Sequence, residues 1–90
     1  MGNRSRTEIV SNILDAAKGG ETSTKIMYKA FLSYGQLKEY LSVLTANNLI
    51  EYLDGTRTFK TTEKGLNFLK MHNEMEELLQ NTIKNNELIL

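Results

Sequence analysis

Apolar side chains recur every three or four residues along four segments of this chain, which is the spacing of one buried face on an α-helix. The pattern predicts helices over residues 7–17, about 22–29, about 33–47 and about 62–85. Between the last two helices, residues 49–53 and 58–60 read as strands on either side of Asp54-Gly55, a strong hairpin signal. The predicted order is three helices, a two-stranded hairpin and a long last helix.

The predicted helix ends carry residues that suit capping. Gly19-Gly20 follows the first helix and allows the positive φ of a C-terminal cap. Ser33 is placed to cap the third helix, because its hydroxyl can accept a first-turn N–H while Gln36 reaches back to complete a capping box. Asn47-Asn48 ends that helix, since asparagine tolerates the left-handed conformation.

The short connection between the second and third helices is the five-residue stretch AFLSY, residues 30–34. Phe31 and Leu32 are expected to anchor this corner in the core, while Ser33 begins the next helix. Two helices joined in this way, followed by a hairpin, form a winged helix-turn-helix. The predicted fold class is therefore mostly α with a small β-hairpin, with a generic helical corner as the alternative.

Charge is distributed unevenly, although the 90 residues carry a formal net charge of zero. Ten Lys/Arg and seven Asp/Glu give residues 1–72 a net charge of +3, and residues 73–90 carry −3. A mildly basic body with an acidic extension is compatible with nucleic-acid binding by the body. The excess is too small to decide this by itself.

Composition excludes several classes of chemistry. With no cysteine, the chain has neither disulfides nor cysteine–zinc sites, which fits a reducing, cytoplasmic interior. His72 is the only histidine, and a lone histidine on a long helix is more often a surface or interface residue than a metal ligand. No nucleophile–base pair or phosphate-binding glycine loop is visible, and no segment is apolar enough to cross a membrane. We expect no catalysis, metal, cofactor, small-molecule substrate or membrane partner.

The stretch from Thr24 to Tyr52 resembles the corresponding segment of small archaeal winged-helix DNA-binding proteins. The shared pattern is T-x-I-M-Y-x-A-x-L-S-Y-x-x-L-x-x-Y-L-x-x-L followed by an apolar strand, and TTEKG at residues 61–65 resembles the link to the last helix. The resemblance implies DNA binding, in a chromatin or regulatory role, by a nucleoid-associated dimer joined through an antiparallel coiled coil. Relatives tend to carry basic residues where this chain has Glu39 and Ser42, and a small polar residue where it has Phe31.

The predicted DNA contacts lie on the third helix, which would enter the major groove, and on the hairpin or wing, which would meet the minor groove or backbone. Gln36 could make a bidentate contact to adenine, and Lys38 could reach guanine or phosphate. A solvated polar helix face is the alternative for these residues, and half-buried packing is the alternative for Tyr34. The complete predicted set is Tyr34, Gln36, Lys38, Ser42, Arg57, Lys60, Lys25 and Lys29.

The last helix keeps an apolar stripe well beyond the length that a winged domain needs. The predicted dimerisation residues are Phe68, Met71, Met75, Leu78, Leu79 and Ile83. Because little of the chain remains to cover them, a second copy is the expected partner, and a frayed tail is the alternative. We expect residues 1–65 to form the DNA-binding domain and residues 66–90 the dimerisation helix. The rival function is a winged helix that docks proteins without binding DNA.

Overall fold

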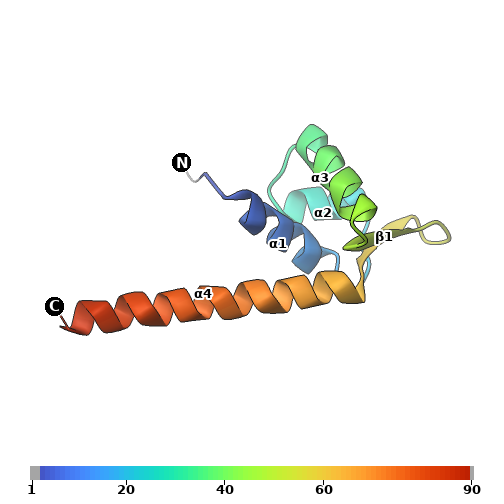
Figure 1. The fold of residues 1–90 in the computed structure, drawn as a ribbon. Helices are drawn as coiled ribbons and strands as arrows, with labels where there is room; N and C mark the ends of the chain where they lie inside the picture. Colours follow the sequence, from blue (N-terminus) through green and yellow to red (C-terminus); the bar gives the residue numbers. More distant parts are fainter. Residues whose placement is uncertain (1–2, 90) are drawn as a thin grey trace.

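The computed structural model describes residues 3–89, with side chains up to residue 81. Six elements follow one another in the predicted order (Figure 1). They are α1 (Arg6–Ala16), α2 (Ser23–Lys29), α3 (Tyr34–Ala46), β1 (Ile50–Leu53), β2 (Thr58–Thr61) and α4 (Glu63–Ile89). The winged helix-turn-helix arrangement with a long C-terminal helix is confirmed.

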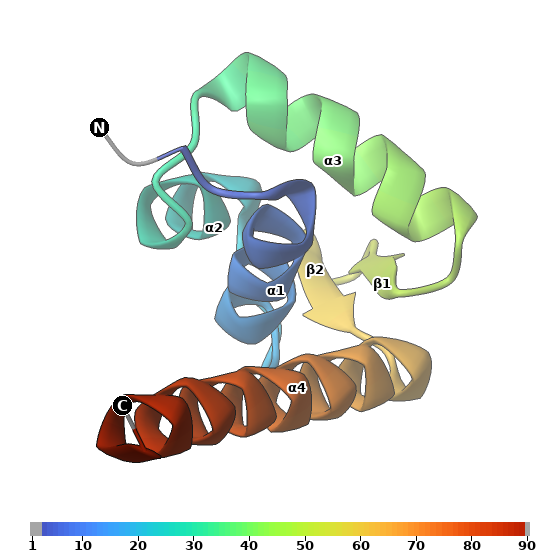
Figure 2. The same cartoon turned by 60° about the vertical axis from the view of Figure 1, so that its left-hand side comes forward.

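The hydrophobic core lies where the first three helices meet the hairpin and the start of α4. Figure 2 shows α1 between α3 and α4. The predicted inward faces are confirmed, because the apolar residues on one side of each of α1, α2 and α3 are buried or packed against the core, whereas Tyr28, Tyr34 and Val43 are exposed. The buried apolar residues are Ile13, Leu14, Ala17, Ile26, Ala30, Leu32, Leu37, Leu41, Leu44, Ile50 and Leu69.

The corner between α2 and α3 differs from the prediction at one residue. Leu32 is 8% exposed and anchors the corner, whereas Phe31 is 84% exposed, so its predicted place in the core was wrong. Phe31 has φ 54°, and the N–H groups of Phe31 and Leu32 donate to the carbonyls of Tyr28 and Met27. This is a Schellman motif in which Phe31 holds the left-handed position, and that conformation turns its side chain away from the body.

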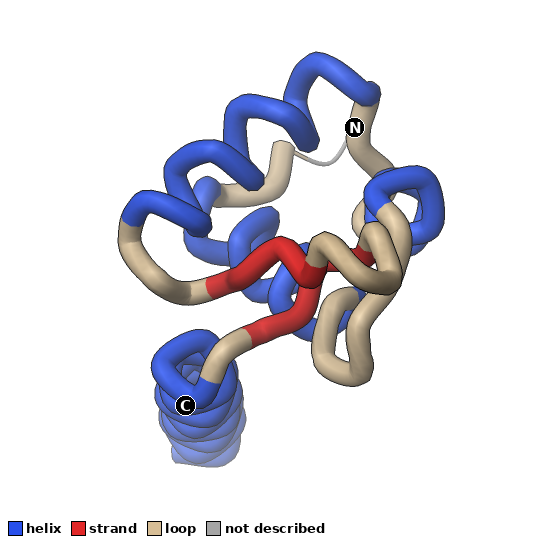
Figure 3. Tube along the Cα trace, turned by 90° about the vertical axis from the view of Figure 1, so that its right-hand side faces the viewer, coloured by secondary structure: helices blue, strands red, loops and turns tan. Residues whose placement is uncertain are grey.

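The hairpin pairs β1 with β2 in antiparallel register, with Ile50 opposite Thr61 and Leu53 opposite Thr58. The connection spans Asp54 to Arg57, and Arg57 takes the left-handed conformation (φ 55°). A second pairing was not predicted: Glu21 and Phe59 exchange both backbone hydrogen bonds, at 2.9 and 2.8 Å. Figure 3 shows the hairpin between α3 above and α4 below.

The start of α4 is fixed tightly to the loop after α3. The Thr62 hydroxyl donates to the Asn48 carbonyl at 2.7 Å and accepts the N–H of Gly65, so Thr62 caps the start of the helix. Lys64 donates to the carbonyl of Asn47 at 3.0 Å. A Cβ on Gly65 would collide with the carbonyl oxygen of Leu49, so only glycine fits this crossing.

Candidate nucleic-acid interface

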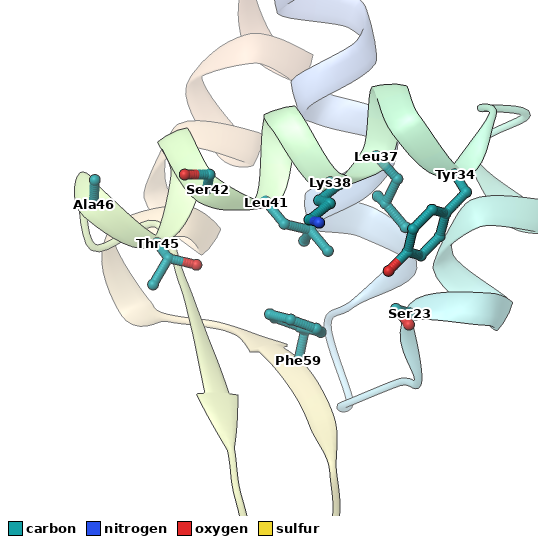
Figure 4. Close-up of a pocket in the computed structure, with 9 residues that line it drawn as sticks. All are labelled: Ser23, Tyr34, Leu37, Lys38, Leu41, Ser42, Thr45, Ala46 and Phe59. Carbon is teal, nitrogen blue, oxygen red and sulfur yellow. The ribbon is translucent and has the colours of Figure 1, made fainter.

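A groove of about 530 Å³ lies between α3 and the hairpin (Figure 4). Buried Leu37 and Leu41 and half-buried Phe59 supply its apolar floor. The other lining residues carry hydroxyl, methyl or amino groups: Ser23, Tyr34, Lys38, Ser42, Thr45 and Ala46. The groove therefore combines an apolar base with a rim of hydrogen-bond donors and one cation.

Three of the predicted DNA contacts meet at this groove. Tyr34, Lys38 and Ser42 lie four residues apart along α3, so they follow one side of the helix. All three side chains are exposed, and that of Tyr34 is 64% exposed, which is not the half-buried packing position considered for it. The sequence pattern did not reveal Ser23, Thr45 and Phe59 as neighbours, because they come from separate elements that only the fold brings together.

Gln36 has a structural partner at the start of α3. Its Oε1 accepts the backbone N–H of Ser33 at 3.1 Å, and the Ser33 hydroxyl accepts the N–H of Gln36 at 3.2 Å. The predicted capping box is thus confirmed. A bidentate contact to adenine needs both the oxygen and the nitrogen of the carboxamide, so Gln36 would have to leave the cap to make it.

The two lysines of α2 have different surroundings. Lys25 is exposed in the first turn of the helix. Lys29 forms an ion pair with Glu21, with 3.3 Å between Nζ and Oε2, and their side chains are 55% and 25% exposed. A phosphate contact by Lys29 would compete with that carboxylate, whereas Lys25 faces no such competition from Glu21.

The wing places Arg57 at its tip, exposed and in the left-handed conformation. Beside it, the hydroxyls of Thr56 and Thr58 lie 2.6 Å apart and bind each other, which orders the loop that carries the arginine. Lys60 is exposed on β2, opposite Glu51 in the sheet register. Arg57 is therefore the one cation of the hairpin loop, residues 54–57, and it is exposed.

The side of α3 that faces α1 is different in character. A second hollow of about 360 Å³ is lined by Arg6 and Val10 of α1 and by Glu39, Tyr40 and Val43 of α3. Glu39 therefore lies with Arg6 on this side and is absent from the groove that Lys38 lines. The acidic residue that departs from the family pattern is thus separated from the cationic side of α3.

The predicted dimerisation residues divide into two groups. Phe68 is partly buried against the core of its own chain and stacks on His72, with ring centroids 6.5 Å apart. Met71, Met75, Leu78 and Leu79 are 58–66% exposed along α4. Ile83 lies outside the residues whose side chains are described.

Arg4, which precedes α1, has a role that the sequence did not indicate. Its Nη1 donates to the carbonyl of Ala30 and its Nη2 to that of Phe31, the latter at 2.8 Å. These two bonds tie the N-terminal arm to the corner between α2 and α3. The guanidinium thus supports the two carbonyls at the end of α2.

Two further findings concern the described residues alone. Among them, His, Asp and Glu side chains nowhere gather in groups of three that could hold a metal ion. None of the helices in the same part of the chain has both the length and the apolar character to cross a bilayer.

Comparison with known proteins places these features in a family. The family model described as winged helix-turn-helix matches residues 3–80 of the chain. A search of curated proteins finds no match. The resemblance to small archaeal winged-helix DNA-binding proteins is confirmed by this match together with the solved structures.

Solved structures share the fold at low sequence identity. The DNA-binding protein Sso10a-2 of Sulfolobus solfataricus superposes with a TM-score of 0.78 at 24% identity, over 96% of this chain and 93% of that one. The transcription regulator MepR of Staphylococcus aureus gives 0.74 at 15% identity, over 93% and 66% of the two chains. ZitR of Lactococcus lactis, in its complex with DNA, gives 0.67 at 19% identity, over 100% and 65%. At these identities the likeness establishes the fold alone.

Proposed function

The chain belongs to the winged helix-turn-helix family, and on that premise we propose that it is a homodimeric DNA-binding protein of chromatin or regulatory type. In this proposal α3 enters the major groove and the wing meets the minor groove or the backbone. The protein acts by binding, without catalysis and without a cofactor. The observation that carries the proposal is the exposed, cationic side of α3 beside the hairpin, at the groove lined by Lys38.

The geometry of α3 supports this placement. An α-helix fits the width of the major groove, and recognition helices of this kind meet base edges with their N-terminal residues. Tyr34 and Lys38 lie in the first turns of α3 and are exposed. A Cβ on Gly35 beside them would meet nothing within 4 Å beyond its chain neighbours and the local helix backbone, so an external surface can approach the backbone closely there.

The cations give the interface the positive charge that binding to DNA phosphates requires. Lys38 on α3, Arg57 on the wing and Lys25 on α2 come from three elements that surround or adjoin the groove. Glu39, the one acidic residue of α3, lines the hollow on the other side of that helix. We infer phosphate contacts for these three cations and for Lys29 and Lys60, and a hydroxyl contact for Ser42.

The exposed stripe of α4 supports the dimer. Its 27 residues span about 40 Å at the rise of an α-helix, and Figure 1 shows the second half extending past the body. Met75 and Leu79 follow Phe68 by seven and eleven residues, so they continue its side of the helix after the core ends. A second copy that packs antiparallel on this stripe would bury it and link two DNA-binding bodies.

The test compares the affinity of charge-matched variants for a mixed-sequence duplex, measured by fluorescence anisotropy at low salt. Lys38→Ala and Arg57→Ala should each weaken binding, because each removes a phosphate contact in both protomers. Lys70→Ala is the control, since it removes the same charge from an exposed position of α4 remote from the groove.

Three results are distinguishable in this test. Losses in the α3 and wing variants with an unchanged Lys70→Ala support the interface. Equal losses in all three would show that net charge alone drives binding and would contradict the proposed face. No duplex binding by the wild-type protein would overturn the proposal and favour a winged helix that docks another protein.

A further inference from the structure

Phe31 occupies a position where a phenylalanine is costly. It holds the left-handed position of the Schellman motif that ends α2, where glycine is the usual residue. A bulky side chain is rare in this conformation, because its Cβ crowds the following carbonyl. Phe31 is also 84% exposed, so the fold gains almost no apolar burial from the ring. The internal structure therefore gives no reason for an aromatic side chain here.

The corner is nevertheless held firmly. Arg4 donates to the carbonyls of Ala30 and Phe31, and Leu32 on the next position is buried in the core. The capping box of Ser33 fixes the chain on the other side. An exposed apolar ring on a well-supported, strained backbone points to a function at the surface of the ring.

Other exposed aromatic residues lie three positions before and three positions after Phe31 along the chain. Tyr28 near the end of α2 is 70% exposed, and Tyr34 at the start of α3 is 64% exposed. We call Tyr28, Phe31 and Tyr34 the aromatic corner. It adjoins the first turn of α3, where Gly35 leaves the backbone open to close approach.

Charge selects the class of partner for this surface. The exposed cations nearest to the aromatic corner along the chain are Lys25, Lys29 and Lys38, on α2 and α3. The nearest carboxylates along the chain are Glu21, which is 25% exposed and already paired with Lys29, and Glu39, which lines the hollow on the α1 side of α3. Apolar rings with cations on both sides match a surface of bases bordered by phosphates better than they match an apolar protein surface.

We propose that the aromatic corner contacts thymine methyl groups at the edge of the major groove, with Phe31 as the principal residue. Within that groove the C5-methyl of thymine is the apolar group that distinguishes it from the other bases, and phenylalanine is among the side chains that contact it. The corner precedes the helix end that enters the groove, so an exposed ring there can reach bases beside those that α3 meets. The protein then prefers thymine at these positions, which are separate from those met by Lys38.

This inference rests on the proposed function, and its test uses the full chain with two duplexes. The duplexes have the same sequence, but every thymine in one is replaced by deoxyuridine, which lacks only the methyl group. Wild-type protein should bind the thymine duplex more tightly, by about fourfold for each methyl group buried against a ring. Phe31→Asn should bind the thymine duplex more weakly and should lose most of the difference between the two duplexes.

Asparagine is the chosen replacement because it tolerates the left-handed conformation, so the corner should fold at least as well as in the wild type. Urea denaturation checks that expectation. Lys38→Ala is the control for binding: it should weaken binding to both duplexes equally and keep their affinity ratio. Because every variant meets the same two duplexes, any difference in duplex stiffness cancels when the ratios are compared.

The inference is overturned if the wild-type ratio is one, or if Phe31→Asn keeps the wild-type ratio. If that ratio is kept while the binding of Phe31→Asn to both duplexes is weaker, the ring contacts only the backbone. If DNA affinity does not depend on Phe31 at all, the corner belongs to a different partner. Failure of the wild type to bind either duplex would instead remove the proposed function itself.

Discussion

At the scale of residues, backbone conformations unfavourable to their side chains coincide with the candidate interface. Phe31, Asn48 and Arg57 have φ values of 54°, 61° and 55°. Asn48 suits its role at the end of α3, since asparagine tolerates the left-handed region. Phe31 and Arg57 do not suit theirs, and both are exposed, one at the α2–α3 corner and one at the wing tip. At both positions the backbone conformation lowers local stability, and at both positions the proposed DNA contact requires a side chain that is directed outward.

Arg57 allows strain and contact to be separated by two substitutions. Arg57→Gly removes the side chain and suits the left-handed conformation, whereas Arg57→Ala removes the side chain and keeps the strain. We expect the glycine variant to be more stable than the alanine variant by about 1 kcal/mol. Both should lose the same DNA affinity. Urea denaturation and anisotropy measure the two quantities, and unequal affinity losses would show that loop conformation matters more than the guanidinium.

Gly35 provides a second test in which stability and binding move in opposite directions. A Cβ at this position would meet nothing within 4 Å beyond its chain neighbours and the local helix backbone, so alanine fits the free protein. Gly35→Ala should raise the free energy of unfolding by about 0.5 kcal/mol, because alanine loses less backbone entropy in a helix. The added methyl should weaken DNA binding if the backbone of α3 approaches DNA there. A variant that is more stable and binds equally well would place the DNA further from this turn.

At the scale of elements, the sequence predicted what depends on local periodicity and capping. The stripe that contains Leu37, Leu41 and Leu44 located α3, and Ser33 with Gln36 located its start. The same reasoning failed for Phe31, because the propensity of an aromatic residue for the core was outweighed by a turn that needs a left-handed residue. It also missed the Glu21–Phe59 pairing, which depends on two segments that meet only after folding.

For the candidate site, the sequence predicted which element carries each proposed contact, but it did not predict the groove that these elements form. The order of elements assigned Lys38 to α3 and Arg57 to the wing, since helix and hairpin signals are local. The groove between them, with Phe59 in its floor, depends on how α3 crosses the hairpin, and no periodicity encodes that crossing. The capping interaction of Gln36 was predicted. Its conflict with a bidentate base contact follows from the structure, because Oε1, which that contact needs, already accepts the N–H of Ser33.

The junction between α3 and α4 yields a prediction about stability. Gly65→Ala should lower the free energy of unfolding by roughly 2–3 kcal/mol, because the new methyl collides with the Leu49 carbonyl and backbone must move. Gly19→Ala is the matched control, since a Cβ there meets nothing within 4 Å. Urea denaturation of both variants measures the difference. Equal stability of the two would show that α4 does not need its close approach to the loop after α3.

At the scale of the whole molecule, the chain pairs a compact body with a helix longer than that body can cover. The body carries the positive charge and the groove, while α4 carries the exposed apolar stripe and the acidic residues Glu74, Glu76 and Glu77. A dimer through α4 would bury the stripe and connect two bodies. Binding of the first body then raises the effective concentration of the second, which suits weakly cationic single domains.

The proposed dimer is tested by Met75→Asp combined with Leu79→Asp. Two charges in an apolar seam should cost several kcal/mol and yield a monomer that remains folded, because neither side chain belongs to the core. Light scattering measures the mass, and circular dichroism confirms folding. Val43→Asp is the control, as Val43 is exposed to the same 58% as Leu79 but lies on α3. A wild type that is monomeric at tens of micromolar would contradict the proposed dimer, because by mass action the dimer would then be even less populated at lower protein concentrations.

The salt dependence of duplex affinity tests the central claim most directly. If a dimer contacts phosphates through Lys38 and Arg57, log K should fall linearly with log salt concentration, by about 0.9 for each phosphate neutralised. Lys38→Ala and Arg57→Ala should each make that slope shallower by about 1.8, because each variant loses one contact in both protomers. Lys70→Ala should leave it unchanged. A wild-type slope near zero, or a slope that neither the α3 nor the wing variant alters, would contradict DNA binding by this face.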